Sequence, residues 1–166
     1  NPNSEYHFGQ ECQEDYSGFY YKLADSLLDT AISLYKMQPT HLGGETAIFG
    51  SMKSGVTWSD DMYKLRPELV ESLFYSWRLT HNLRSKKVAY KILKAIKKYC
   101  RTESGYTSIR DTSQRVVIWE DLQDSYFLSE TLKYLYLIFS DNDVYSLDDY
   151  IFTTQAHPLK KLLFKN

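Results

Sequence analysis

The sequence predicts a single all-α unit with short β-hairpins. Long segments repeat apolar residues at every third or fourth position, which is the spacing of amphipathic helices. A very short loop joins two of these segments, and the stretches that suit strands are brief. At 166 residues the chain has the size of one domain, and no internal repeat or linker divides it.

The first predicted helix runs from Phe19 to Met37, and residues 1–17 are left as loop. Pro39 ends the helix, because the residue before a proline disfavours the helical conformation. The glycine pair at 43–44 suits a tight turn, and residues 46–50 then predict a short strand. Loop is expected from there to Leu65. The helix rests on apolar positions that recur at helical spacing: Leu23, Leu27, Leu28, Ala31, Ile32 and Leu34.

The helix around which the chain is organised begins at Pro67 and runs to about Thr80. Proline is favoured in the first turn, where its missing N–H costs nothing. Glu68 and Glu71 both fall in this turn and share nearly one face. The helix dipole and the free N–H groups favour their ionised forms, which suits a base or a ligand better than an acid. The alternative is a charged first turn that serves only to cap the helix.

A short turn at residues 81–84 leads into a second helix that ends near Tyr99. Its apolar residues face one side and its lysines the other. Helices joined so briefly must pack as an antiparallel hairpin. After it, residues 102–109 predict a turn entering a short strand, and residues 111–121 are expected to be exposed.

The third predicted helix spans Leu122 to Ser140. A stripe along it is interpreted as core packing: Leu128, Leu132, Leu135 and Phe139. Tyr126, Glu130 and Tyr134 follow a separate line at steps of four. A carboxylate between two tyrosines is either a hydrogen-bonded structural group or part of a site. Residues 150–154 predict a strand, and Pro158 forces a turn because proline cannot lie within a central strand.

Composition excludes some partners. The net charge of −1 and the mixing of acidic with basic residues give no reason to expect nucleic acid or an anionic membrane as a partner. Aromatic residues make up 16% of the chain, which suits either a sugar or peptide surface or a tyrosine-rich core.

Cys12 and Cys100 are compatible with pairing, with free thiols or with partners elsewhere. No stretch approaches the length of a membrane span, and the polar start does not predict a signal peptide, although cleavage from a longer anchored precursor stays open.

Three motifs carry a resemblance to a known family. They are Arg66-Pro67-Glu68-Leu69-Val70-Glu71-Ser72, the segment from Ser125 to Tyr136, and Phe152-Thr153-Thr154-Gln155-Ala156-His157-Pro158. In order and spacing they resemble the class I α-mannosidases, the calcium-dependent, inverting α-1,2-mannosidases of glycoside hydrolase family 47. Residues 23–45 agree more weakly. The resemblance implies a barrel of seven α-helical hairpins, of which residues 1–166 would form the C-terminal portion, a partial α/α barrel.

The resemblance also implies roles for individual residues. Glu68 matches the catalytic general base, which activates a water for attack on the anomeric carbon of mannose. Thr154 matches the threonine whose hydroxyl and carbonyl oxygens hold Ca²⁺, a hard cation that prefers oxygen ligands. The acid of an inverting pair would lie upstream of this chain. The remaining matched positions line the sugar site and the surroundings of the metal: Arg66, Glu71, Tyr126, Glu130 and Gln155.

The chain also departs from the family pattern. Gln155 replaces a glutamate, which removes a negative charge and predicts weaker calcium binding. Tyr126 replaces a phenylalanine expected under the sugar ring, and the aromatic face survives. Asp124 replaces another glutamate and so shortens its reach. Ala31 stands where many members carry one cysteine of a disulfide, so that bridge is expected to be absent.

The expected activity is inverting hydrolysis of terminal α-1,2-linked mannose from high-mannose N-glycans by a longer protein, with the fragment alone inactive. An alternative is a catalytically impaired, mannosidase-like factor that binds glycans in glycoprotein quality control and degradation. The expected partner is the high-mannose N-glycan, and the expected location is the lumen of the endoplasmic reticulum or Golgi. Any membrane attachment would come from a segment outside this chain.

Overall fold

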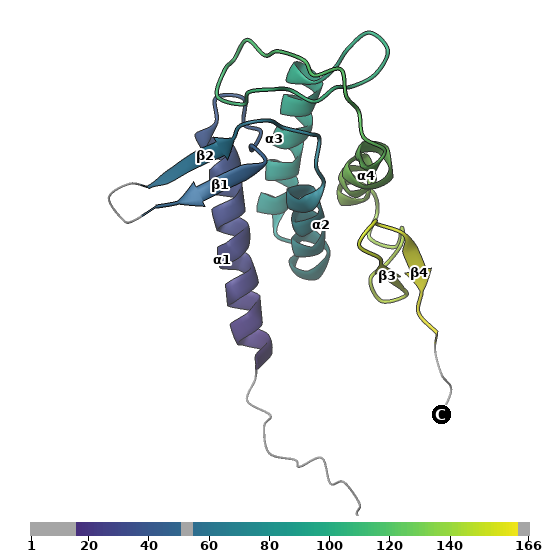
Figure 1. Ribbon diagram of the computed structural model, residues 1–166. Coiled ribbons are helices and arrows are strands. Elements are labelled where there is room, and N and C mark those ends of the chain that lie inside the picture. Colours follow the sequence, from purple (N-terminus) through teal and green to yellow (C-terminus); the bar gives the residue numbers. More distant parts are fainter. Residues whose placement is uncertain (1–15, 51–54, 163–166) are drawn as a thin grey trace, which may run out of the picture.

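The structure is a computed structural model that describes residues 16–50 and 55–162 (Figure 1). Its elements follow the chain in this order: α1 (Tyr16–Met37), β1 (Thr46–Phe49), β2 (Val56–Asp60), α2 (Glu68–Thr80), α3 (Leu83–Tyr99), the π-helix η1 (Phe127–Leu132), α4 (Lys133–Phe139), β3 (Tyr150–Phe152) and β4 (Pro158–Lys160). The first helix thus begins three residues before the predicted start. Most of the expected loop at 1–17 lies outside the described residues. No described helix is long and apolar enough to cross a membrane.

Helix α2 is the centre of the fold and contacts α1, α3 and α4. Its buried face, Leu69, Val70, Leu73 and Phe74, packs in one core with residues of α3 and α4. The predicted antiparallel hairpin of α2 and α3 is confirmed. Its turn is short because His81 adopts a left-handed conformation (φ 54°) and the Asn82 side chain accepts a hydrogen bond from the Arg84 N–H at 3.0 Å.

Two antiparallel β-hairpins decorate the helices, as the predicted fold class requires, but the second strand of each was not predicted. Strand β2 pairs with β1 in the segment expected to be loop. Strand β4 pairs with β3 and begins at Pro158. Proline is tolerated there because the first residue of an edge strand can lack an N–H. The predicted turn before Pro158 is confirmed.

The prediction for the third helix was wrong at its start and at two positions of its stripe, whereas Leu135 is buried and Leu132 packs against the core as predicted. The helix begins at Phe127, because the backbone of Leu122 is held by Ser108 and Thr107. Leu128 and Phe139 are 59% and 44% exposed, although both were expected in the core. The first turn is π-helical, and its wider i→i+5 bonding rotates the following side chains relative to an α-helix. The core side is formed instead by Phe127, Thr131, Tyr134, Leu135, Leu137 and Ile138.

The connecting segment from Arg101 to Asp121 also differs from expectation. The short strand predicted within 102–109 is replaced by isolated bridges, such as the one between Tyr63 and Ile109. Thr112, expected to be exposed, is buried, and its carbonyl accepts a hydrogen bond from the Thr40 hydroxyl at 2.8 Å. Cys100 is a buried free thiol, and burial raises its pKa to about 12. Cys12 lies outside the described residues.

Candidate active site

The first turn of α2 places Glu68 at the edge of a cleft. Leu69 and Val70 are buried in the core, so the helix is fixed with Glu68 exposed. The cleft beside it has a volume of about 510 Å³. Glu68 therefore lies at the N-terminus of α2, exposed to solvent and open to a ligand in the cleft. The residues that line this cleft are Ala31, Tyr35, Gly43, Gly44, Glu45, Tyr63, Arg66, Glu68, Leu69 and Ser72.

Arg66 is fixed in this cleft from two sides. Its Nε donates to Oε2 of Glu45 at 2.6 Å, and this hydrogen bond raises the pKa of Arg66. Its guanidinium carbon lies 5.5 Å from the centre of the Tyr126 ring. A guanidinium held in this way keeps further N–H donors for a ligand.

The Tyr126 ring is in turn held by its hydroxyl. The hydroxyl donates to the Lys64 carbonyl at 2.7 Å and to Oδ2 of Asp124 at 2.8 Å. Burial and the bond to Asp124 raise the pKa of Tyr126. Asp124 and Tyr126, both expected from the sequence to differ from the family, are hydrogen-bonded to each other.

Glu71 is anchored by a buried tyrosine. The Tyr134 hydroxyl donates to Oε1 of Glu71 at 3.1 Å, and Tyr134 itself is fully buried. Burial and the charge of Glu71 raise the pKa of Tyr134. Tyr134 thus remains the neutral donor, and Glu71 keeps one fixed orientation at the end of the core.

Glu130 joins this carboxylate cluster. Burial raises its pKa, the charges of Glu68 and Glu71 add to the rise, and Lys133 and His157 oppose it. Within the described part of the chain, no hydrogen bond engages the Glu130 carboxylate. The hydroxyls of Tyr126 and Tyr134 donate to other groups and not to Glu130. The structure therefore does not support the interpretation that Glu130 is a structural group held by hydrogen bonds to these tyrosines. A half-buried carboxylate without a protein partner is suited to bind a ligand.

The turn between β3 and β4 carries Thr154 and Gln155, which are both exposed. Three hydrogen bonds between Thr153 and residues 156–157 close the turn. Lys133, three residues after Glu130, donates to the Ala156 carbonyl at 2.8 Å and ties the turn to that helix. Thr154 does not line the cleft beside Glu68, although His157, three residues after it, and Glu68 both influence the pKa of Glu130.

Thr154 offers oxygen donors of the kind that a hard cation binds. No group of three or more His, Cys, Asp or Glu side chains converges as a metal site in residues 16–50 and 55–162. The hydroxyl and carbonyl oxygens of Thr154 make no hydrogen bond to any described residue. They offer two hard oxygen donors, and Ca²⁺ takes such ligands together with water.

Sequence reasoning missed Glu45, Lys133 and His157 as parts of the site. The signal for Glu45 was the glycine pair before it. A Cβ on Gly44 would lie 2.5 Å from the Asp60 carbonyl oxygen, so only glycine lets the chain pass there and bring Glu45 to Arg66. For Lys133 and His157 the sequence holds no comparable local signal.

Clustered carboxylates beside an aromatic ring, at the ends of helical hairpins, are typical of glycoside-cleaving domains. The chain belongs to glycosyl hydrolase family 47, whose profile matches residues 8–161. It is 41% identical over 152 residues to human mannosyl-oligosaccharide 1,2-alpha-mannosidase IC, covering 90% of this chain and 24% of that protein. It is 40% identical over 149 residues to mannosyl-oligosaccharide alpha-1,2-mannosidase IA of Drosophila melanogaster, covering 89% and 22%.

A solved structure gives the same assignment. The alpha-1,2-mannosidase from Trichoderma reesei superposes with a TM-score of 0.76 at 28% sequence identity, over 88% of this chain and 34% of that one. The fold is therefore part of an α/α barrel, as the resemblance implied. The chain spans about a quarter of the length of the curated relatives that it matches.

Proposed function

We propose that this chain is the C-terminal part of a catalytic domain that removes terminal α-1,2-linked mannose from high-mannose N-glycans with inversion. Membership of family 47 and the activity in the names of its relatives support this function. The observation that carries it is Glu68 on the cleft, with Glu71 and Glu130 near enough to interact electrostatically, and with no hydrogen bond from a described residue to the Glu130 carboxylate.

Glu68 acts as the general base. It accepts a proton from a water molecule, whose oxygen then forms a bond to the anomeric carbon as the bond to the leaving sugar breaks. Inversion needs an acid on the opposite side, roughly 6.5 to 9.5 Å from the base, and the longer protein supplies it from outside this chain. The exposed position of Glu68 on the cleft gives a water molecule access to its carboxylate.

The neighbouring side chains orient the sugar. Tyr126, held through its hydroxyl, presents an aromatic face, and Arg66 above it donates to sugar hydroxyls. Glu71, Glu130 and Gln155 accept or donate hydrogen bonds around the same ring. The fixed positions of Arg66 and Glu71 support this role, because preorganised donors and acceptors lose little freedom on binding.

Thr154 holds Ca²⁺ through its hydroxyl and carbonyl oxygens. A bound calcium ion would bind sugar hydroxyls and fix the ring relative to Glu68. The unpartnered oxygens of Thr154 and the negative charges of Glu71 and Glu130 support this assignment. Because Gln155 is neutral, this chain binds the metal more weakly than a protein with glutamate there.

The protein acts in the lumen of the endoplasmic reticulum or Golgi, where N-glycans are processed. Its partner is the glycan of a glycoprotein, and a segment outside this chain provides any membrane anchor. The relatives are named for their action on mannosyl-oligosaccharides, and this substrate is the support for the proposed location.

The test of this function is Glu68→Gln in the full-length protein, assayed on a high-mannose glycan with and without a chelator. Loss of a general base lowers kcat by about a hundredfold or more. Glu103→Gln, an exposed carboxylate outside the cleft, is the matched control and keeps the original rate. Undiminished trimming by Glu68→Gln would refute the role of the base.

A second function is favoured by Gln155: a factor that binds glycans in quality control and degradation with little hydrolysis. It differs from the first in predicting glycan binding without product and weak calcium affinity. The substitution Gln155→Glu decides between them. If Gln155→Glu gains both calcium affinity and trimming activity that the unchanged protein lacks, the unchanged protein is the binding factor. Full trimming by the unchanged protein would exclude this second function.

A further inference from the structure

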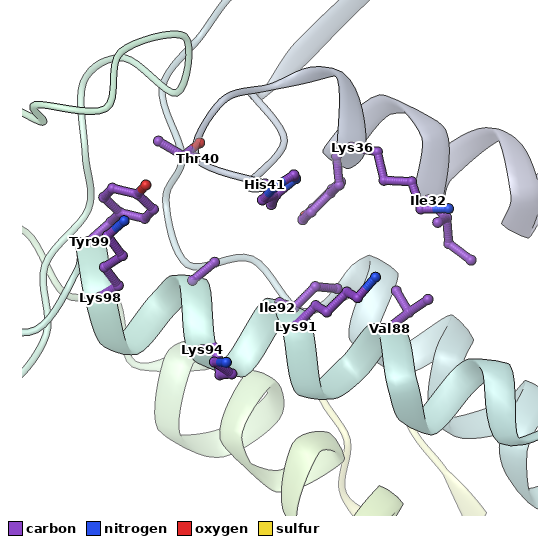
Figure 2. Close-up of a pocket in the computed structure, with 12 residues that line it drawn as sticks. Ile32, Lys36, Thr40, His41, Val88, Lys91, Ile92, Lys94, Lys98 and Tyr99 are labelled. Atoms are coloured by element: carbon purple, nitrogen blue, oxygen red, sulfur yellow. The ribbon is translucent and has the colours of Figure 1, made fainter.

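A second cleft lies between α1 and α3 (Figure 2), and Tyr35 lines both this cleft and the one beside Glu68. Both helices pack against α2, and a space of about 650 Å³ remains between them. Figure 2 shows Ile32 and Lys36 on the α1 side and Val88, Lys91 and Ile92 on the α3 side. Its volume is typical of a binding site.

The floor of this cleft is apolar and narrow. Ile32 and Ile92 are each 2% exposed and Ala95 is 7% exposed, although all three line the space. A floor so little exposed cannot admit a whole helix and accepts only slim groups such as single aliphatic side chains. Burial of such groups supplies apolar binding energy.

The rim of the cleft is positively charged. Four lysines surround it, Lys36 from α1 and Lys91, Lys94 and Lys98 from α3, and no described lining residue is acidic. None of the four forms an ion pair with a described residue. Helix α3 carries seven cationic side chains and no carboxylate, in a chain whose net charge is −1. Of these seven, Arg84 pairs with Asp25 and Asp29 of α1, so it is the four rim lysines that predict an anionic occupant.

We propose that this cleft binds an acidic peptide segment of a partner protein, with aliphatic side chains in the cleft and carboxylates on the lysine rim. Lys91 and Lys98 lie about 10 Å apart along α3, and Lys36 faces them from α1, so a small ligand with one anionic head cannot pair with all of them. A peptide with several carboxylates can. A flat membrane surface cannot fill a recessed apolar floor. The site is independent of the proposed hydrolase activity.

The test measures binding of a labelled peptide of alternating glutamate and leucine to the full-length protein by fluorescence anisotropy. Lys91→Glu with Lys98→Glu reverses two rim charges and weakens binding by about tenfold or more. Lys87→Glu with Lys97→Glu is the matched control. It makes the same charge change on the same exposed helix outside the cleft and weakens binding by less than about threefold.

Two further probes separate the contributions. A glutamine–leucine peptide and a glutamate–serine peptide each bind at least about tenfold more weakly than the glutamate–leucine peptide if both rim and floor take part. Equal weakening by the two double variants, equal binding of the serine peptide, or no peptide binding would overturn the proposal. Tighter binding to phosphatidylserine vesicles than to the peptide, lost in the rim variant, would overturn it in favour of a membrane surface.

Discussion

Single residues in the candidate site compensate for one another. A tyrosine at 126 brings a hydroxyl that must be satisfied near the core, and the shorter carboxylate of Asp124 accepts its hydrogen bond. The Lys64 carbonyl accepts a second one. These hydrogen bonds fix the ring on which Arg66 lies.

The substitution Tyr126→Phe tests this coupling. It removes both hydrogen bonds but keeps the ring, and we expect the free energy of unfolding to fall by about 1 kcal/mol. The measurement is urea denaturation of the full-length protein. Tyr136→Phe is the control, because Tyr136 is exposed and its hydroxyl bonds no described residue. Equal effects of the two substitutions would show that the hydroxyl of Tyr126 has no structural role.

Glu130 should make stability depend on pH. Because its pKa is raised above the ordinary 4.5 in the folded state, its ionisation costs stability, and this cost is present at pH 7. In the presence of a chelator, Glu130→Gln should therefore raise the Tm at pH 7. The gain should shrink as the pH falls through the raised pKa and vanish below 4.5, where Glu130 is protonated in both states.

The groups that set this behaviour are Glu68 and Glu71, which raise the pKa, and Lys133 and His157, which oppose the rise. Glu103→Gln is the control and should give the same Tm as the unchanged protein at every pH. A lower Tm for Glu130→Gln at pH 7 would mean that the ionised carboxylate is stabilised by a protein partner, contrary to the structure.

At the scale of elements, α2 is tied to the end of α4 by one side chain. Arg78, in the last turn of α2, is buried and donates to the carbonyls of Leu137, Asp141, Asn142 and Val144. The Leu137 carbonyl is one of the last carbonyls of α4, which lack partners within the helix, and the other three belong to the segment that follows α4. Burial lowers the pKa of Arg78, with Asp143 opposing the change.

Arg78→Lys should therefore be costly although it keeps the charge. A lysine ammonium cannot reach all four carbonyls, so we expect a loss of about 2 kcal/mol in the full-length protein. Urea denaturation measures it. Arg110→Lys is the control, since Arg110 forms an exposed ion pair with Glu120 and should change stability by less than about 1 kcal/mol. If Arg78→Lys lowers the free energy of unfolding by no more than Arg110→Lys does, the hydrogen bonds of Arg78 do not hold α2 to α4.

Elements specified by local signals were predictable from the sequence, and those set by tertiary contacts were not. The α2–α3 hairpin follows from Pro67, a short turn and helical periodicity. The π-helical turn at Phe127 depends on the contacts that hold Leu122, which periodicity does not reveal. Strands β2 and β4 are short and exist only through their partners.

The same distinction applies to the site. Glu68 and Glu71 could be assigned to one helix turn from sequence spacing alone. The ion pair between Glu45 and Arg66 joins residues 21 apart, and the bond from Lys133 to Ala156 joins residues 23 apart. Both need the fold: the resemblance to the family covered all of these segments, but it did not pair Glu45 with Arg66 or Lys133 with Ala156.

At the scale of the whole molecule, the chain exposes apolar surface that a complete barrel would cover. Phe19 and Leu27 of α1 are each 62% exposed, and Leu128 of η1 is also exposed. The relatives are about four times longer, which fits a barrel that continues beyond this chain. Exposed apolar faces of this size are an aggregation risk.

The isolated 166-residue chain should consequently be inactive and lack a sharp thermal transition. We expect a broad melt by circular dichroism and binding of a hydrophobic dye at 25 °C, because the packing of α1 is incomplete. The full-length protein is the control and should melt cooperatively without binding the dye. A sharp cooperative melt of the isolated chain would contradict this account.

The central claim is that Glu68 and the turn bearing Thr154 serve one sugar and calcium site. The most direct measurement is a crystal structure of the full-length protein with Ca²⁺ and a mannose ligand, using anomalous scattering to locate the metal. The account predicts Ca²⁺ on the hydroxyl and carbonyl oxygens of Thr154, with the sugar between the metal and Glu68. Calcium elsewhere, or a sugar in a cavity that Glu68 does not face, would contradict it.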